Sequence, residues 1–476
     1  MSEPRTYPVR KGETVPLRVE ALAFGGQGVA RIEGFTVFVP GGLPGQLVDG
    51  LIIRRRKGYA EARIERVVEP SPHQVEPRCA HFGTCGGCLL QHYDYTSQLE
   101  AKRVQVVDCM TRLGGLPNLP VAAPVPAPGS YEYRNKMEYS FGPRRWLETV
   151  EIEKDSTHDR FGLGLHPRGR HDRVLNVERC HLDDAIGAGI VTRVRDFARE
   201  SGLAAYSTRD HQGFWRFLVL RTGQNTGHRM VLLITAGTQP GKPGWRAVET
   251  LAAELRAAFP EITSLIHGES DRKASVAVAE RVRVLHGEPV IQERTGGFTF
   301  EIGPRTFFQT NTRQAERLFD IAVEHAALEP GDVVWDLYCG VGALTLPLAA
   351  RAARAVGMEL VEEAVAAARR NAVANGVTNA TFHAGDIREL MRGDGVESQR
   401  PNVVVLDPPR EGVHADVLAA VTARGPRCIV YVSCNPATLA RDLAILTAAG
   451  YQPQGVQPVD MFPHTAHIEC VVRLTR

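Results

Sequence analysis

Long hydrophobic runs are missing from the 476-residue sequence. No stretch approaches the roughly 20 apolar residues that a membrane-spanning helix needs. The first residues, MSEPRTYPVRKGETVPL, also lack the apolar core of a secretory signal. We therefore expect a cytoplasmic protein without a membrane partner.

A strong net charge is also absent, because 56 basic residues face 54 acidic ones. The overall charge thus gives little support for a nucleic-acid partner, although basic residues concentrate locally in IIRRRKGYAEARIER at 52–66. Nine cysteines without an export signal argue against a disulfide framework. They should instead be metal ligands, catalytic thiols or core residues.

The N-terminal part of the chain has a β pattern broken by glycine-rich turns. Five short strands within so few residues indicate a small closed barrel of the OB type. Such barrels bind single-stranded nucleic acid, and a general module for protein contacts is an equal alternative on composition alone. The expected strands are 15–23, 28–32, 35–40, 46–56 and 59–68.

From about residue 310 onwards, apolar strands alternate with alanine-rich helices. This alternation is typical of a parallel, doubly wound sheet. The proline-rich stretch 116–130 predicts a semi-rigid connector, and the part that follows it is mixed α+β. We therefore predict an α/β multidomain chain whose three parts span 1–70, 71–300 and 301–476.

A glycine turn in VVWDLYCGVGALTL at 333–346 predicts a cofactor site. The strand reaches Asp336, turns at Gly340 and Gly342 and enters a helix, and ligands of open α/β sheets bind at such strand ends. The third glycine of a dinucleotide site is absent, since Thr345 takes its position. Three later strands also end at acids, which are Glu359, Asp386 and Asp407.

The stretch YVSCNP at 431–436 ends a strand at a cysteine. Taken alone, Cys434 fits a small buried residue, because free cysteines are often buried. The last strand begins in HTAHIECVV, with Glu469 near its start. The glycine turn followed by DPPR resembles class I S-adenosylmethionine methyltransferases, and in their seven-stranded sheet this last strand runs antiparallel beside the fifth. We therefore expect Glu469 near Cys434, and Cys470 pointing to the opposite face.

A thiol and a carboxylate that face a methyl donor suit one reaction in particular. A thiolate that adds to C6 of a pyrimidine makes C5 nucleophilic enough to attack a methyl sulfonium. A base must then remove the C5 proton before the thiol leaves. We expect Cys434 to be this nucleophile, with a pKa below the usual value of about 8.5, and Glu469 to be the base.

The motifs DPPREG, SCNP followed by ATLARD, and PHTAHIE resemble the RNA (uracil-5-)-methyltransferase family over 300–476. The opening of the glycine turn resembles class I S-adenosylmethionine methyltransferases more generally. The resemblance implies that Cys434 and Glu469 are catalytic. It implies a cofactor site for S-adenosylmethionine formed by Gln309, Tyr338, Gly340, Glu359, Asp386 and Asp407.

Two departures from related patterns matter. Ala343 stands where family members often carry asparagine after the second glycine, which leaves at most a backbone contact there. RNA cytosine-5 enzymes carry a second cysteine after the proline of the DPP motif, and amino-group methyltransferases carry an aromatic residue. Here Arg410 follows Pro409.

Three cysteines lie close together in CAHFGTCGGC, and Cys180 is the candidate for a fourth ligand. Both zinc and an iron–sulfur cluster take four thiolates, and spacing does not separate them. The spacing resembles the cluster segment of the 23S ribosomal RNA branch of the family. That resemblance implies a [4Fe–4S] cluster on Cys79, Cys85, Cys88 and Cys180, for which we expect a structural or RNA-docking role.

Residues 12–69 resemble a TRAM domain, which implies RNA binding. We expect phosphate contacts from 54–57 (RRRK) and base stacking by aromatic residues of 131–141. The sequence therefore predicts a monomer that methylates C5 of a uridine in structured RNA, with 23S rRNA as the favoured substrate. The alternatives are the same reaction on tRNA and a non-catalytic RNA-binding iron–sulfur protein.

Overall fold

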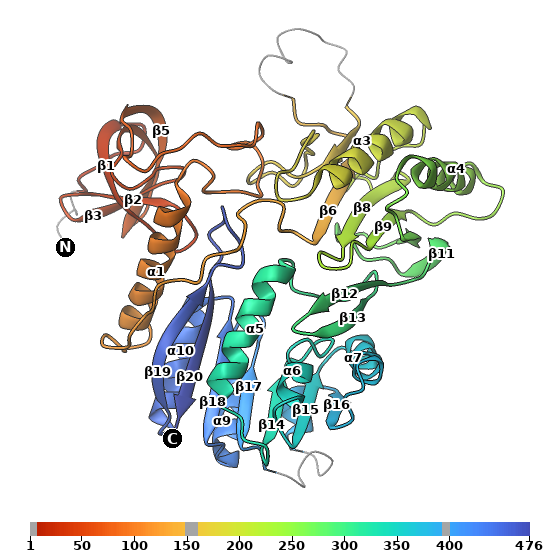
Figure 1. Cartoon of the computed structure of the whole chain (residues 1–476). Helices are drawn as coiled ribbons and strands as arrows, with labels where there is room; N and C mark the ends of the chain where they lie inside the picture. The colour runs from red at the N-terminus through yellow and green to blue at the C-terminus, as the bar shows by residue number, and fades with distance from the viewer. Residues whose placement is uncertain (1–6, 148–159, 393–399) are drawn as a thin grey trace.

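The structure is a computed structural model that describes residues 7–147, 160–392 and 400–476. A small barrel, a central sheet and a larger C-terminal sheet follow one another along the chain (Figure 1). The closed five-stranded barrel that the sequence predicted is confirmed, and its strand order is β1-β2-β3-β5-β4. Its strands are β1 (Thr14–Leu22), β2 (Gly28–Ile32), β3 (Phe35–Val39), β4 (Leu47–Arg55) and β5 (Tyr59–Glu69).

The central part has a six-stranded sheet in the order β11-β10-β9-β8-β6-β7, with two helices packed against it. A separate hairpin of β12 (Ile291–Thr295) and β13 (Phe298–Ile302) follows it. The predicted mixed α+β character is thus confirmed. The other elements are β6 (Lys136–Gly142), β7 (Gly162–Gly164), α3 (Ala185–Glu200), β8 (Trp215–Thr222), β9 (Arg229–Thr235), α4 (Pro243–Ala258), β10 (Ser264–Glu269) and β11 (Arg281–Gly287).

The aromatic residues predicted to stack RNA bases in 131–141 are mostly in this core instead. Tyr133, Tyr139 and Phe141 are each less than 10% exposed. The prediction was wrong for these three side chains. Tyr139 and Phe141 are alternate residues of β6 that face the packed helices, and Tyr133 precedes β6 and donates its hydroxyl to the carbonyl oxygen of Pro463. Tyr131 is partly exposed.

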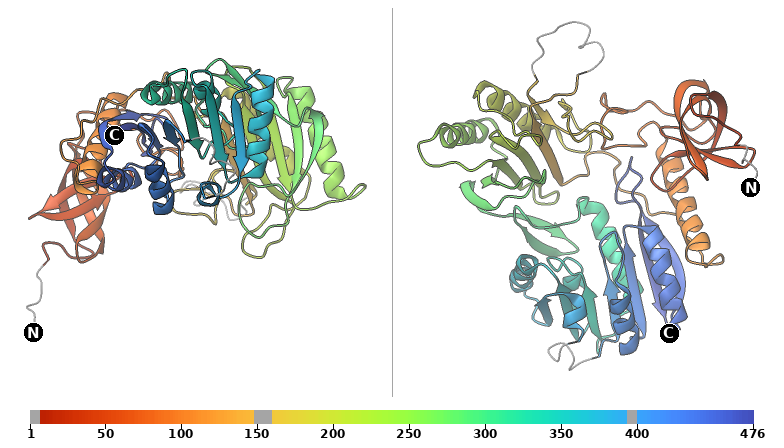
Figure 2. Two further views of the ribbon diagram at one scale, coloured as in Figure 1. Left: turned by 90° about the horizontal axis from the view of Figure 1, so that it is seen from below. Right: turned by 180° about the vertical axis from the view of Figure 1, so that it is seen from behind.

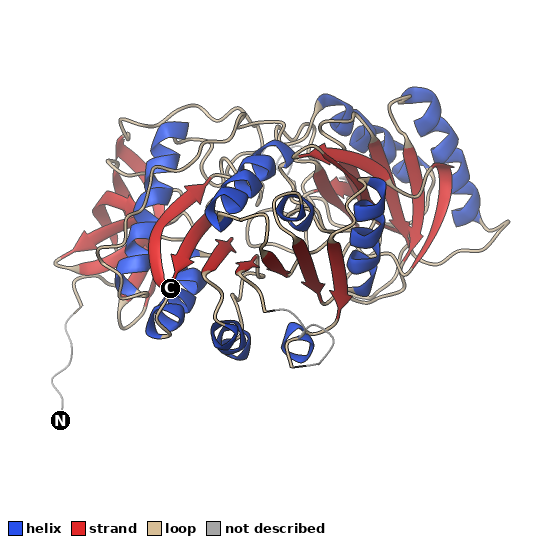
Figure 3. Ribbon diagram, turned by 60° about the horizontal axis from the view of Figure 1, so that its bottom comes forward, coloured by secondary structure: helices blue, strands red, loops and turns tan. Residues whose placement is uncertain are grey.

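The C-terminal sheet has seven strands in the order β16-β15-β14-β17-β18-β20-β19. The predicted doubly wound sheet is confirmed, and β20 runs antiparallel beside β18, the fifth strand, as expected. Helices lie on both faces of the sheet (Figure 3). The strands are β14 (Val333–Leu337), β15 (Arg354–Glu359), β16 (Ala380–Ala384), β17 (Val403–Leu406), β18 (Cys428–Ser433), β19 (Gln452–Val459) and β20 (Glu469–Thr475).

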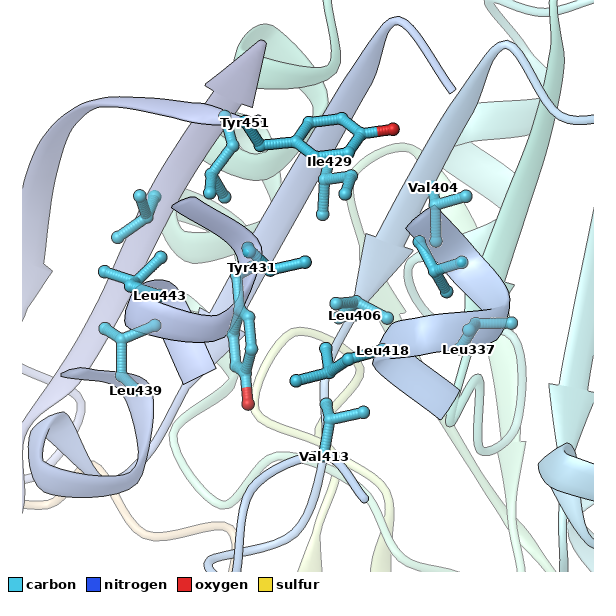
Figure 4. Packing of buried hydrophobic residues seen from close by; sticks show 14 of the residues in the cluster. Leu337, Val404, Leu406, Val413, Leu418, Ile429, Tyr431, Leu439, Leu443 and Tyr451 are labelled. Carbon is cyan, nitrogen blue, oxygen red and sulfur yellow. The ribbon is translucent and has the colours of Figure 1, made fainter. Parts of the chain in front are cut away.

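Two hydrophobic clusters, one on each face, hold the helices to this sheet. Figure 4 shows side chains of β17 and β18 meeting those of two helices on one face. The alternating strand residues that face the opposite side pack against α5. The helices are α5 (Thr312–Ala326), α6 (Thr345–Ala349), α7 (Glu362–Ala374), α8 (Ile387–Leu390), α9 (Ala415–Arg424) and α10 (Pro436–Ala448).

A helix from the earlier part of the chain, α1 (Tyr95–Arg112), also packs on the C-terminal sheet. Val106 and Met110 belong to its hydrophobic cluster, and Figure 2 shows α1 alongside the sheet from behind. The proline-rich stretch 116–130 is more than a connector, because Val121 and Val125 bridge to β19 and cover this edge strand. The domain division at residues 70 and 300 stays a prediction.

None of the helices within the three described stretches combines the length and apolar character that crossing a bilayer requires.

Candidate active site

The cofactor turn follows β14 at the point where the strand order reverses, which is where open α/β sheets bind ligands. Tyr338 has a φ of 70°, a left-handed conformation that is uncommon for a non-glycine residue. Its backbone N–H and that of Cys339 both donate to the carbonyl oxygen of Met358, at 2.9 and 3.1 Å. The turn is thereby fixed to the neighbouring strand with its backbone exposed toward the strand ends.

A cavity opens at this turn and contains most of the predicted cofactor residues. Asp336 in its wall is buried, and burial raises the pKa of its carboxyl to about 7. Thr345 donates a hydrogen bond to its Oδ2 at 2.5 Å, whereas its Oδ1 has no hydrogen-bond partner. A free buried acceptor in the wall fits a cofactor that brings a donor or a cation. The predicted residues that line the cavity are Gln309, Tyr338, Gly340 and Asp407.

The other two predicted cofactor residues lie at the ends of the next strands. Glu359 accepts hydrogen bonds from the N–H groups of Gly340, at 3.1 Å, and Val361, at 2.9 Å. Asp386 caps α8 and pairs with Arg388 at 2.6 Å, which lowers the pKa of Asp386 to about 2. Ala343 also lines the cavity.

Cys434 and Glu469 lie next to each other at the same edge of the sheet. Ser433 pairs with Cys470 across β18 and β20, so one step further along the antiparallel register brings Cys434 opposite Glu469. Asp407 directly follows β17, the other neighbour of β18. Cys470 points the other way, into a hydrophobic cluster.

The electrostatics at Cys434 differ from the expectation. Burial and the nearby carboxyl groups of Glu469 and Asp407 raise the pKa of Cys434 to about 12, and the charge of Arg410 and a backbone hydrogen bond oppose them. The expected low pKa was therefore wrong for the site without substrate. Burial likewise raises the pKa of Glu469 well above its usual range and that of Asp407 to about 7, because few other charges compensate.

Arg410 is the functional candidate whose position the sequence did not reveal. Its carbonyl oxygen accepts hydrogen bonds from Asn435 Nδ2 at 3.1 Å and Thr438 Oγ1 at 3.3 Å, which tie the DPPR loop to the loop after Cys434. Its guanidinium lies 3.4 Å from Nδ1 of His467. The sequence did contain a signal for this position, since DPPR places a positively charged residue directly after two prolines at the end of a strand.

The four predicted metal ligands come together although Cys180 is distant in the chain. They line one cavity of about 540 Å³. Burial raises the pKa of Cys88 to about 11 and that of Cys180 to about 12, and Cys79 and Cys85 add to the rise at Cys88. Protonated thiols in such a position lose their protons when they coordinate a metal.

The donor set of four thiols fits more than one kind of metal group. Among residues 7–147, 160–392 and 400–476, no three His, Cys, Asp or Glu side chains converge as one metal ion would require. Zinc and an iron–sulfur cluster both take four thiolates, so the donor set fits either group.

The predicted phosphate contacts lie at the end of the β4–β5 hairpin and are exposed. Two of them already have partners, since Arg55 stacks over Tyr7 at 4.2 Å and Arg54 pairs with Glu61 at 3.3 Å. Arg56 and Lys57 stand at the tip of the hairpin. The hairpin thus presents positive charge to solvent, as phosphate binding requires.

The C-terminal part has the fold of a class I S-adenosylmethionine-dependent methyltransferase, since its parallel strands are followed by one reversed strand and its cofactor turn lies at the switch point. Known proteins agree with this assignment. The family model for tRNA (uracil-5-)-methyltransferase matches residues 272–476, and the TRAM domain model matches 8–64.

Relatives match over nearly the full length. An uncharacterized RNA methyltransferase of Porphyromonas gingivalis is 39% identical over 475 residues, covering 97% of this chain and 99% of the relative. One of Nitratidesulfovibrio vulgaris is 40% identical over 467 residues, covering 98% and 96%. The crystal structure of a Pyrococcus abyssi tRNA (uracil-54, C5)-methyltransferase with S-adenosyl-L-homocysteine has a TM-score of 0.73 at 27% identity, covering 97% of this chain and 100% of that one.

The chain belongs to the RNA (uracil-5-)-methyltransferase family and carries an N-terminal TRAM domain. It is an S-adenosylmethionine-dependent transferase that methylates C5 of uridine in RNA.

Proposed function

We propose that this enzyme makes 5-methyluridine in 23S rRNA through a covalent bond between Cys434 and C6 of the target uracil. The observation that carries the mechanism is the register that brings Glu469 opposite Cys434, with Asp407 at the adjacent strand end. A thiol and a carboxyl at one edge can act in turn on neighbouring ring atoms, C6 and C5.

The order of proton transfers follows from the pKa shifts. Burial and two carboxyl groups favour the protonated thiol of Cys434, whereas the charge of Arg410 favours the thiolate. The thiol gives its proton to solvent as the attacking thiolate forms. After the methyl group has been transferred, Glu469 takes the C5 proton, and the electrons of the C5–H bond reform the C5–C6 double bond as the Cys434 sulfur leaves.

The proposed cofactor residues lie in two places, around the cavity and at the ends of the next strands. S-adenosylmethionine supplies the methyl group on a sulfonium cation when bound. Gln309, Tyr338 and the backbone of Gly340 line its cavity, and Glu359 and Asp386 extend the site along the next strand ends. Asp407 stands between the cavity and Cys434 and orients the uracil.

For the four-thiol site we propose a [4Fe–4S] cluster held by Cys79, Cys85, Cys88 and Cys180. The cavity that all four thiols line supports a four-thiolate group, and the resemblance of their spacing to the 23S ribosomal RNA branch supports a cluster over zinc.

The choice of RNA is open to a direct test. The family resemblance of the thiol segment supports 23S rRNA, whereas the full-length likeness to a Pyrococcus abyssi enzyme named for tRNA supports tRNA. We propose 23S rRNA first, for a monomeric cytoplasmic enzyme. The target base must leave its stack to reach Cys434.

The experiment is methyl transfer from labelled S-adenosylmethionine to unmodified 23S rRNA and to tRNA transcripts, followed by mass spectrometry of the labelled nucleoside. We expect 5-methyluridine in 23S rRNA. Label in tRNA alone would retain the mechanism and overturn the substrate, and 5-methylcytidine would overturn the mechanism.

A trapping experiment distinguishes the proposed methyltransferase from the alternative of a non-catalytic RNA-binding protein. RNA that contains 5-fluorouridine has no C5 proton to remove, so a working Cys434 stays bonded to it after methyl transfer. We expect a covalent complex that survives denaturing electrophoresis, and a non-catalytic protein would form none.

A further inference from the structure

The segment that precedes Glu469 is held in place by residues from distant parts of the chain. Residues 460–468 connect β19 to β20, and Glu469 is the first residue of β20. His464 in the middle of this segment is buried and has a φ of 64°. A non-glycine residue in this conformation needs support from its surroundings.

That support comes first from the residues that directly follow the thiol segment. The backbone N–H groups of Leu89 and Leu90 both donate to the carbonyl oxygen of His464, at 2.8 and 3.0 Å. Leu89 is adjacent to Cys88 in the sequence. A displacement of Cys88 would therefore be transmitted to His464 through two short hydrogen bonds.

A buried glutamine of α1 closes the same network. The Oε1 atom of Gln98 accepts from the N–H of His464 at 3.0 Å, while its Nε2 donates to the carbonyl oxygens of Leu90 at 2.9 Å and Tyr93 at 2.7 Å. Gln98 has no exposed surface. A single side chain thus joins the residues after the thiol site to the residues before Glu469.

Further contacts fix the flanks of the segment. The hydroxyl of Tyr133 donates to the carbonyl oxygen of Pro463 at 3.0 Å, and Tyr131 packs on the ring of His464 with 4.5 Å between centroids. Lys102 forms a buried ion pair with Asp460 at 2.6 Å. The segment is therefore held on several sides, and its other end is the residue opposite Cys434.

We propose that Leu89, Leu90, Gln98 and Tyr133 are positioning residues for Glu469, and that the four-thiol site acts on catalysis by fixing this segment. The inference rests on the proposed function, because it takes Glu469 as the base and Cys88 as a ligand. It gives the metal group a role that differs from RNA docking. Misplacing the base should slow removal of the C5 proton and leave attack by Cys434 and methyl transfer unchanged.

The test compares two tyrosines whose hydroxyl groups donate hydrogen bonds to different segments of the chain. Tyr133→Phe removes the hydroxyl that donates to Pro463. Tyr451→Phe is the matched control, because its buried hydroxyl donates to the carbonyl oxygen of Pro426, also a proline, at 2.9 Å and away from the site. A stronger pair on α1 is Gln98→Met against Gln105→Met, since Gln105 is buried and its Oε1 has no hydrogen-bond partner.

Two reactions are measured in the full-length, metal-loaded protein. Covalent trapping by 5-fluorouridine RNA reports attack and methyl transfer, and release of tritium from RNA labelled at C5 of uridine reports proton removal. We expect Tyr133→Phe and Gln98→Met to trap at the wild-type rate. We expect them to release tritium at least about tenfold more slowly, since a shift of about 1 Å can cost as much as 10²-fold. Ordinary uridine RNA should then accumulate as a methylated covalent complex.

A second arm tests the thiol site itself. Hydrogen exchange at residues 460–468 should become faster in Cys88→Ala, with the same loss of tritium release and retained trapping by the folded fraction. An equal fall in trapping and release, or no change in either, would overturn the inference. A wild-type protein that never traps 5-fluorouridine RNA would instead overturn the proposed function.

Discussion

Glu469 lies opposite Cys434 because β20 runs antiparallel to β18 with Ser433 paired to Cys470. A shift of this register by one residue would turn Glu469 toward the helices and bring Cys470 to the reaction site. Burial raises the pKa of Glu469 well above its usual range. The position of the proposed base is therefore set by the backbone pairing, and its protonation by its buried surroundings.

Replacing the proposed base should stop the reaction at a late step. We expect Glu469→Gln to lower turnover by about 10²–10⁴-fold, as for other general bases, while the methylated RNA remains bonded to Cys434. The measurement is the fraction of uridine RNA that migrates with protein on a denaturing gel. The double variant with Cys434→Ala should show no covalent complex, and normal turnover of Glu469→Gln would contradict its assignment as the base.

Arg410 should control the pH dependence of adduct formation. It lowers the pKa of Cys434 against burial and two carboxyl groups, so its loss raises that pKa further. The thiolate fraction at neutral pH then falls, and we expect Arg410→Met to move the pH profile of 5-fluorouridine trapping upwards by about one unit. Arg410→Lys should restore part of the shift. The exposed Arg392, changed to Met, is the control, and an unmoved profile in Arg410→Met would contradict the role.

Asp407 should lower the free energy of unfolding of the chain at neutral and higher pH, although the reaction needs its carboxyl group. Its pKa is about 7 in the folded chain, against about 3.9 in an unfolded one. The folded state therefore binds more protons between these values, and the free energy of unfolding falls as pH rises from about 4 to 7. We expect Asp407→Asn to be more stable at pH 8, by roughly 1–3 kcal/mol, and to lose activity.

The measurement for Asp407 is denaturant unfolding at pH 5 and pH 8. The matched control is the exposed Asp416→Asn. A pH dependence that is the same in wild type and Asp407→Asn would show that Asp407 titrates normally.

The four-thiol site should hold iron and inorganic sulfide. We expect about four of each per chain when the protein is purified without oxygen, with a broad visible absorption. Cys88→Ala should lose most of the iron. Cys109→Ala removes a thiol from a hydrophobic cluster and should retain it. One zinc per chain, with no sulfide, would contradict the cluster.

Much of this molecule could be predicted from local patterns. The five barrel strands and the alternating strands and helices after residue 310 follow from hydrophobic periodicity and glycine turns, which act over a few residues. The strand-end positions of Asp407 and Cys434 follow in the same way. Strand β19 was missed, since its prolines at 453 and 458 break a strand pattern, although they are tolerated near a sheet edge.

The electrostatics could not be predicted in this way. The sequence indicated a reactive cysteine, and chemistry alone suggested a low pKa. Burial and two neighbouring carboxyl groups decide the actual direction at Cys434, and their effect depends on distances between strand ends.

The sequence by itself determined the family, the cofactor turn and the residues available for chemistry, because motifs and periodicity are written in neighbouring positions. Only the tertiary structure decided that Cys180 joins Cys79–Cys88 around one cavity and that Leu90 and Gln98 hold the segment before Glu469. These relationships arise from packing between segments that are distant from each other in the chain. Each depends on backbone groups and side-chain amides whose partners no local pattern specifies.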